Sequence, residues 1–251
     1  MRTVVLLLVL LSATVHGASV TWAIANSNES FTLIQISGSI VNGDLNKVKQ
    51  ALSEAPPRSQ HGPFLGWHSM VRIDSDGGDV EEAMAIGRAL RAQAAPVDAG
   101  ECVGTCVLIL AAGVQRYANR VGIHRPYRID PIASRRSGKW QYAPMSKQVG
   151  DYLHEMGMPK RLYEEMMRVP FESLRWLTAA ELKEFGLVGM DSTYSDANDV
   201  RQAARYGVSK AEYLSRQARA LRDCGQFPER PFEAEMKAWK GCYEPRIRGE
   251  R

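Results

Sequence analysis

The most informative part of this sequence is residues 71–93, VRIDSDGGDVEEAMAIGRALRAQ. Residues 71–73 are mostly β-branched and predict a short strand, and residues 80–93 carry apolar side chains at helical spacing. Between them stands the pair Gly77 and Gly78. Glycine lets the backbone turn tightly and expose consecutive N–H groups beside the positive end of a helix, where an anion can bind. The stretch therefore predicts a strand, a turn with accessible backbone donors, and a helix.

Strands and helices alternate on both sides of this stretch. Residues 32–40 alternate in polarity and are rich in β-branched side chains, as expected of a strand, and residues 107–112 are apolar throughout and predict a buried helix. This alternation predicts parallel strands joined by right-handed crossovers, which is an α/β fold with a mainly parallel sheet. The further expected elements are a helix at residues 44–51, strands at residues 96–100, 116–118 and 121–123, and a turn at residues 101–106.

The second half of the chain becomes helical. Residues 127–144 are basic and irregular, which predicts a loop or hairpin. Thr178 followed by Glu181 has the spacing of a capping box and predicts the start of a short helix. Beyond Asp191 the sequence is polar with little β character, so we expect a helical extension over residues 192–251. Further helices are expected at residues 145–156 and 160–168, and extended structure at residues 187–188.

The N-terminus has the pattern of a secretory signal. One arginine precedes an apolar run, and small residues follow as far as Gly17, so we expect cleavage after Gly17. The run is too short for a permanent membrane helix, and no later stretch approaches about 20 apolar residues. The expected organisation is a signal at residues 1–17, an α/β domain at residues 18–191 and the helical extension. The mature protein is expected to be periplasmic or secreted, with no attachment to the membrane.

The cysteines fit an exported protein. They form an even set, which predicts disulfides in an oxidising compartment. Their spacing lacks the paired CxxC and the histidines of a zinc site, so no metal is expected. Helical spacing would bring Cys102 and Cys106 within bridging range. A bridge from Cys224 to Cys242 would link two helices of the extension and stabilise them by about 3 kcal/mol in the loop-entropy description. The net charge of +4 is small and its cations are scattered among anions, so nucleic acid is not an expected partner.

Three strings occur in the order found in one enzyme family. They are IDSDGGDVEEAMAIGRALR at residues 73–91, GECVGTCVLILAAGVQRYANRVGIHRP at residues 100–126 and RWLTAAELKEFGLV at residues 175–188. Together they resemble the ClpP serine proteases, in particular the exported, stand-alone relatives, over roughly residues 32–191. The resemblance implies the ClpP/crotonase-like fold, a repeated ββα spiral with a mainly parallel sheet.

The resemblance also implies a site. By position, Gly78 and Thr105 would donate the two backbone N–H groups of an oxyanion hole, a kind of donor that is commonly worth a few kcal/mol in the transition state. His124 stands where the family has its general base, although a histidine that only fills a polar notch fits the sequence as well. The nucleophile position falls on Gly104, which has no atom able to attack a carbonyl. The family's aspartate corresponds to Leu174.

These departures decide the expected function. We expect an exported ClpP-like homologue that is inactive or impaired as a peptidase and keeps a cleft for peptides or unfolded polypeptide segments, with no cofactor. The alternative is an active hydrolase whose nucleophile is Cys106 or Ser173. Glu172 and Ser173 lie close to the position of the missing aspartate, but a register shift of one or two residues would be needed to use either of them there. A coenzyme A thioester enzyme is a third class, because related folds use the same amide pair without serine. Relatives of this fold often form trimers or larger rings, so a homo-oligomer is also open.

Overall fold

The computed structural model describes residues 17–24, 32–54, 69–129, 136, 142–226 and 233–250. The predicted signal therefore lies outside the described residues except for Gly17, and so does most of the basic segment between residues 129 and 142. Within the described part of the chain, no helix combines the length and the apolar character that crossing a membrane requires.

The fold is α/β, built on a mixed and mostly parallel sheet, as the sequence predicts. Four neighbouring strands, β2 to β5, are parallel, and β1, β8 and β9 pair antiparallel at the two sides of this group. The strand order is β1-β2-β3-β4-β5-β8, with β9 also paired to β5. The bounds are β1 Ser19–Ile24, β2 Thr32–Ser37, β3 Ser69–Ser75, β4 Val97–Val103, β5 Gln115–Ile123, β8 Arg175–Trp176 and β9 Gly189–Met190.

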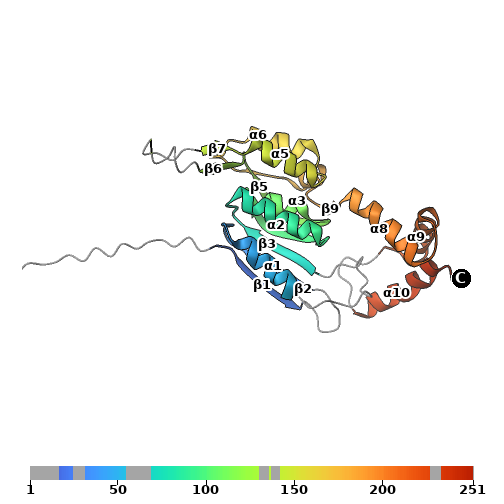
Figure 1. The fold of residues 1–251 in the computed structure, drawn as a ribbon. Helices are drawn as coiled ribbons and strands as arrows, with labels where there is room; N and C mark the ends of the chain where they lie inside the picture. The colour runs from blue at the N-terminus through green and yellow to red at the C-terminus, as the bar shows by residue number, and fades with distance from the viewer. Residues whose placement is uncertain are drawn as a thin grey trace, which may run out of the picture.

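Helices connect and cover these strands (Figure 1). In the α/β region they are α1 Asp44–Glu54, α2 Val80–Ala92, α3 Cys106–Ala112, α5 Ser146–Glu155, α6 Lys160–Arg168 and α7 Ala179–Glu184. A small antiparallel pair, β6 Tyr127–Ile129 and β7 Tyr142–Pro144, lies between β5 and α5 in the sequence. The loop or hairpin expected there is therefore a hairpin at its two described ends.

The core lies between the parallel strands and their helices. Alternate residues of β2 and β3 are buried, and β4 buries Val97, Ala99 and, after a register shift, Cys102, as a sheet with one face toward a core requires. Every residue of α3 is buried, which fits a helix that is apolar on all sides. The apolar run at residues 107–112 thus forms the buried helix that its sequence predicts.

Several details differ from the sequence-based expectation. The extended structure expected at residues 187–188 falls instead at β9, and β8 was not expected. β4 continues to Val103 because Cys102 pairs with β3 on one side and β5 on the other, so the turn expected at residues 101–106 shrinks to Gly104 and Thr105. The two strands expected at residues 116–118 and 121–123 are one strand, β5. β1 was not expected, because nothing local marks it; it exists through its antiparallel pairing with β2.

A buried guanidinium links the C-terminal ends of three helices of the α/β region. Arg116, on β5, donates hydrogen bonds to the carbonyls of Ala111, Met156 and Gly186, which stand at or just beyond the ends of α3, α5 and α7. Carbonyls at helix C-termini lack intrahelical partners, so a cation there is favourable. The same guanidinium lies 3.2 Å from the buried carboxylate of Asp191, which Arg91 also contacts at 3.1 Å.

The helical extension begins at Asp191. This residue caps α8 (Ser192–Arg205), and α9 (Lys210–Cys224) and α10 (Glu233–Arg248) follow, leading away from the sheet (Figure 1). The disulfides are Cys102–Cys106 in the α/β region and Cys224–Cys242 between α9 and α10. The first joins the end of a strand to the start of a helix, so the pairing is as expected but its geometry is not helical. Both bonds are typical of an oxidising, extracytoplasmic environment.

Candidate functional site

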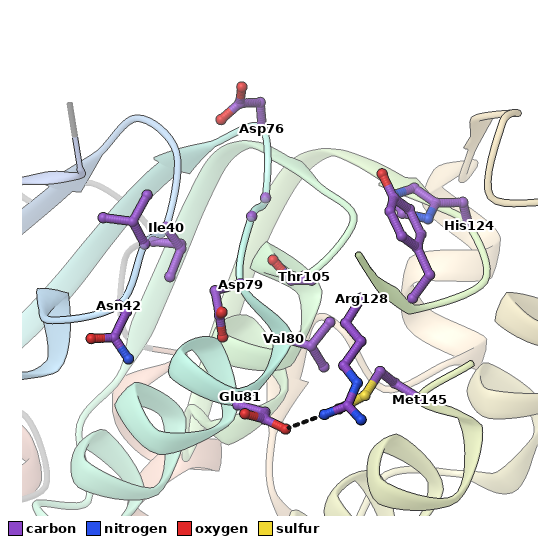
Figure 2. A pocket seen from close by; sticks show the side chains of 14 residues that line it. Ile40, Asn42, Asp76, Asp79, Val80, Glu81, Thr105, His124, Arg128 and Met145 are labelled. Carbon is purple, nitrogen blue, oxygen red and sulfur yellow. Dashed lines mark ion pairs between the residues drawn. The ribbon is translucent and has the colours of Figure 1, made fainter. Parts of the chain in front are cut away.

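The sequence-predicted site residues meet at the carboxyl edge of the parallel strands. The Gly77–Gly78 turn follows β3, the Gly104–Thr105 turn follows β4, and His124 follows the last residue of β5. Neighbouring parallel strands end at the same edge of a sheet, which is where ligands bind in such folds. A cleft of about 510 Å³ opens there, and Figure 2 shows Thr105 between the Ile40 side and the His124 side of it.

Gly78 is held against the segment that follows β2. Ile40 donates to the Gly77 carbonyl at 2.7 Å and accepts from the Asp79 N–H at 2.8 Å, so the chain brackets Gly78 in a single parallel bridge. A Cβ at Gly78 would lie 2.1 Å from the Ile40 carbonyl oxygen, and its φ is +136°. Only glycine fits this position, because the obstacle is backbone and the conformation disfavours side chains. Neither hydrogen bond of this bridge uses the N–H of Gly78.

Position 104 faces the histidine directly. Gly104 has φ of +59°, and a Cβ built on it would lie 2.6 Å from Nε2 of His124. The turn is fixed by the Gly104 N–H, which donates to the Gly122 carbonyl at 2.9 Å and so extends the pairing of β4 with β5. The structure therefore brings together the two positions that the resemblance assigns to nucleophile and base.

His124 has a backbone partner where a carboxylate would be needed. Its Nδ1 lies 3.0 Å from the Arg125 carbonyl oxygen. Since a carbonyl can only accept, Nδ1 carries the proton in this contact, and in the neutral ring Nε2 presents its lone pair toward Gly104. The pairing of β5 with β8 ends at Ile123 and Arg175, so His124 and Leu174 each lie one residue beyond it. Leu174, which the resemblance matches to the third triad member, packs on the neighbouring Gly122, where a built Cβ would lie 2.8 Å from its Cδ1.

Thr105 supplies the other expected donor. A Cβ on Gly77 would lie 3.2 Å from the Thr105 nitrogen, so the two turns adjoin. Among the residues that the structure describes, none accepts a hydrogen bond from the backbone N–H of Gly78 or of Thr105. The Thr105 hydroxyl is likewise buried and without a partner in the described structure. Backbone donors without a partner next to a cleft are available to a ligand that brings an acceptor.

The charges around the cleft are mainly negative. Asp76, Asp79 and Glu81 line it, against the single guanidinium of Arg128 among the described lining residues. Glu81 and Arg128 form an ion pair at 3.6 Å between the start of α2 and β6 (Figure 2). Both side chains are largely exposed, so this pair contributes little to stability. Arg128 was not predicted to line the site; the signal in the sequence was its place near the start of the predicted hairpin, shortly after His124.

The alternative nucleophiles are placed differently. Cys106 is fully buried and bonded to Cys102, so it has no thiol to ionise in this state. Ser173 is exposed, and its N–H donates to the Pro170 carbonyl. In the described part of the chain, no hydrogen bond joins Glu172 or Ser173 to His124. Nor do the described residues contain a group of three or more histidine, cysteine or acidic side chains able to hold a metal.

No protein-family model matches this chain, and no curated protein sequence is significantly similar to it. The assignment of roles to Gly78, Gly104, Thr105 and His124 therefore stays a prediction that rests on the quoted strings. The geometry adds that Gly78, Thr105 and His124 line one cleft and that Gly104 faces the His124 ring.

Proposed function

We propose that this chain is an exported protein of the ClpP/crotonase-like fold, periplasmic or secreted, whose cleft binds extended polypeptide without cleaving it. The observation that carries the proposal is that position 104 faces Nε2 of His124, where a built Cβ would lie 2.6 Å from it, and that the residue at this position is glycine. A base without a nucleophile contributes nothing to covalent acyl transfer.

Backbone chemistry supports peptide as the ligand. The free N–H groups of Gly78 and Thr105 fit the carbonyl oxygens of an extended chain, which are acceptors that every peptide repeats. The volume of about 510 Å³ is within the range of sites that bind small ligands or a few residues. The acidic rim formed by Asp76, Asp79 and Glu81 favours basic peptides over acidic ones.

The same rim weighs against a coenzyme A thioester as the ligand. Coenzyme A carries several phosphate charges, and each would approach carboxylates that only Arg128 offsets among the described lining residues. The disulfide at Cys106 weighs against the thiol form of an active hydrolase. A peptide cleft without covalent chemistry fits the described residues better than either alternative.

The direct test is to restore the missing oxygen. Gly104→Ser should gain slow labelling by a fluorophosphonate probe and slow hydrolysis of an activated ester, because its Oγ would lie beside Nε2 once the imidazole shifts to admit the new Cβ. Its rate should lie about four orders of magnitude below that of an intact triad, since the carboxylate is absent. Gly104→Ala is the matched control, with the same backbone strain and no oxygen. Stoichiometric labelling of the unmodified protein would overturn the proposal.

A second substitution tests the inferred position of the third member. Leu174→Asp added to Gly104→Ser should raise ester hydrolysis above that of Gly104→Ser alone, while Leu174→Asn should not. The gain should vanish when His124→Ala is added, because the carboxylate acts only through the imidazole.

Peptide binding is tested on protein that keeps Gly104 and Leu174. Fluorescence anisotropy with unfolded peptides of matched length and opposite charge should show tighter binding of the basic peptide, and Asp76→Asn should weaken that preference. Asp151→Asn, an exposed carboxylate on α5, is the control and should leave it unchanged. No binding of any peptide at concentrations up to about 1 mM, a limit that corresponds to only about 4 kcal/mol, would contradict the proposed cleft.

A further inference from the structure

A carboxylate is buried beside the backbone nitrogen of Ala18. The side chain of Asp44 is only 1% exposed, and its Oδ2 accepts the Ala18 N–H at 3.0 Å and the Val41 N–H at 2.9 Å. Ala18 itself is 1% exposed. The Ala18 carbonyl in turn accepts from Lys47 Nζ at 3.0 Å. The residue that follows the predicted cleavage point is thus held by hydrogen bonds at both its N–H and its carbonyl group.

The negative charge at this place exceeds the positive charge from side chains. Glu82, a residue of α2, is a second buried carboxylate. It lies at the start of α1, where it accepts the N–H groups of Gly43 and Leu45. Among the described residues, Lys47 is the only cation in an ion pair with either carboxylate, and its side chain is 49% exposed. The positive end of α1 offsets part of the charge. A buried anion normally needs a close, equally buried cation.

We infer that removal of residues 1–17 creates the N-terminus of the mature protein at Ala18, and that its ammonium group forms a buried ion pair with the Asp44 carboxylate. In the cleavage, water adds across the Gly17–Ala18 peptide bond: Gly17 leaves with a new carboxylate and Ala18 keeps the nitrogen, which is protonated to an ammonium. A signal peptidase of the export pathway catalyses this step. The inference rests on the proposed export and is independent of the peptide cleft.

The site is already arranged for that charge. The nitrogen that would become the ammonium lies at hydrogen-bond distance from Asp44, so cleavage converts a neutral donor into a charged one without moving it. Charge-assisted hydrogen bonds are roughly twice as strong as neutral ones. Burial by itself raises the pKa of Asp44, but hydrogen bonds from Lys47, Val41 and Ala18 outweigh it and hold this pKa below the ordinary value. Asp44 is therefore ionised and ready to pair.

The first experiment identifies the N-terminus. The full chain, expressed in a host that exports it, should yield a mature protein whose terminal sequence is Ala18-Ser19-Val20-Thr21 by mass spectrometry. A terminus at any other residue, or retention of residues 1–17, overturns the inference. The peptide-binding measurements above do not depend on this result, so the two proposals fail separately.

The second experiment asks whether the new amine is buried. In the folded mature protein the Ala18 amine should react with an acylating reagent at least about tenfold more slowly than in the unfolded protein, because acylation needs an accessible, deprotonated amine. Lys49, an exposed lysine on α1, is the internal control and should react at a similar rate in both states. Equal acylation of the Ala18 amine in the folded and unfolded protein overturns the ion pair.

The third experiment measures the coupling. Mature protein beginning at Ala18 is compared with protein that retains residues 12–17, each with Asp44 and with Asp44→Asn. The mature terminus should raise the melting temperature by several degrees with Asp44 present, and this gain should vanish with Asp44→Asn. An equal gain in both backgrounds overturns the pairing with Asp44. If Asp44→Asn does not fold, the acylation result decides.

Discussion

The α/β region and the helical extension solve the same problem of stability with very different cores. The first buries one face of several strands and a whole helix, whereas the apolar cluster in the described part of the extension consists of Ala203, Tyr213, Ala220 and Ile247. The disulfides differ in the same way. Cys102–Cys106 is fully buried in a packed environment, while Cys224 and Cys242 are half-buried in a region with little else to hold it.

The contrast teaches that one type of bond can serve two purposes. In the extension, a link across 18 residues restricts an unfolded segment that has few apolar contacts to order it. In the α/β region, a link across four residues encloses Gly104 and Thr105, so it fixes a turn more than it adds to an already large core. Small folding units commonly depend on such covalent links, and large ones do not.

The largest expected effect is at the joint between the two regions. Asp191→Asn keeps a side chain that can cap α8 but removes the charge opposite Arg116 and Arg91. It should lower the free energy of unfolding by about 3–5 kcal/mol, since it leaves a buried guanidinium without its anion. Denaturant unfolding gives the value. Asp151→Asn, at an exposed pair with Lys147, is the control and should change little.

This effect should depend on pH in one direction. Burial raises the pKa of Asp191, but the Tyr194 N–H, Arg91 and Arg116 together lower it below the ordinary 3.8. A carboxyl group with a lowered folded-state pKa stabilises the protein above its unfolded pKa and loses that contribution as pH falls through the folded value. The difference between Asp191 and Asp191→Asn should therefore be constant near neutral pH and shrink below pH 3.8. A difference unchanged down to pH 2 would contradict the assignment.

The next largest effects are expected from removing the disulfides, and each removal should affect a different region. Replacing Cys224 and Cys242 by alanine should cost about 3 kcal/mol, and replacing Cys102 and Cys106 by alanine about 2 kcal/mol in loop entropy. Hydrogen exchange should place the first loss in α9 and α10 alone, while the second should leave these helices unchanged. If the first pair of substitutions also raised exchange in β2 to β5, the two regions would fold as one unit.

Helix caps should give the smallest effects and sharpen the comparison further. Thr178 caps α7 in the α/β region, and Ser209 caps α9 in the extension, each accepting a backbone N–H three residues on. Substitution of either by alanine should cost about 1 kcal/mol. Because the extension has less stability to lose, Ser209→Ala should increase local hydrogen exchange more than Thr178→Ala does. Equal increases would argue against a weaker extension.

Much of the α/β region could be predicted because its signals are local. The helix at residues 80–92 and the buried helix at residues 106–112 follow from periodicity and apolar content, and the glycine pair marks its own turn. β1 could not be found this way, because its pairing with β2 is a tertiary contact. The end of β4 was missed for the same reason: Glu101–Val103 read as a turn beside Gly104, yet strands on both sides pair with it.

The site was partly predictable for a physical reason. Residues that end neighbouring parallel strands must lie at one edge of the sheet, so Gly78, Gly104 and His124 could be placed together from their order in the chain. The contacts that define their chemistry could not. Neither the Arg125 carbonyl at Nδ1 nor the packing of Leu174 on Gly122 follows from spacing, because the first depends on the rotamer and the second on the register that the fold selects.

The ring closed by Cys102 and Cys106 sets how a ligand must be received. Gly104 and Thr105 lie inside this ring, and its cystine sulfurs are sealed from solvent. The backbone around the Thr105 amide is therefore ordered before a ligand arrives. Binding there has a smaller entropic cost than binding to a flexible turn would have. A reductant strong enough to open the ring would make each binding event re-order the turn, so affinity would fall although no contact residue had changed.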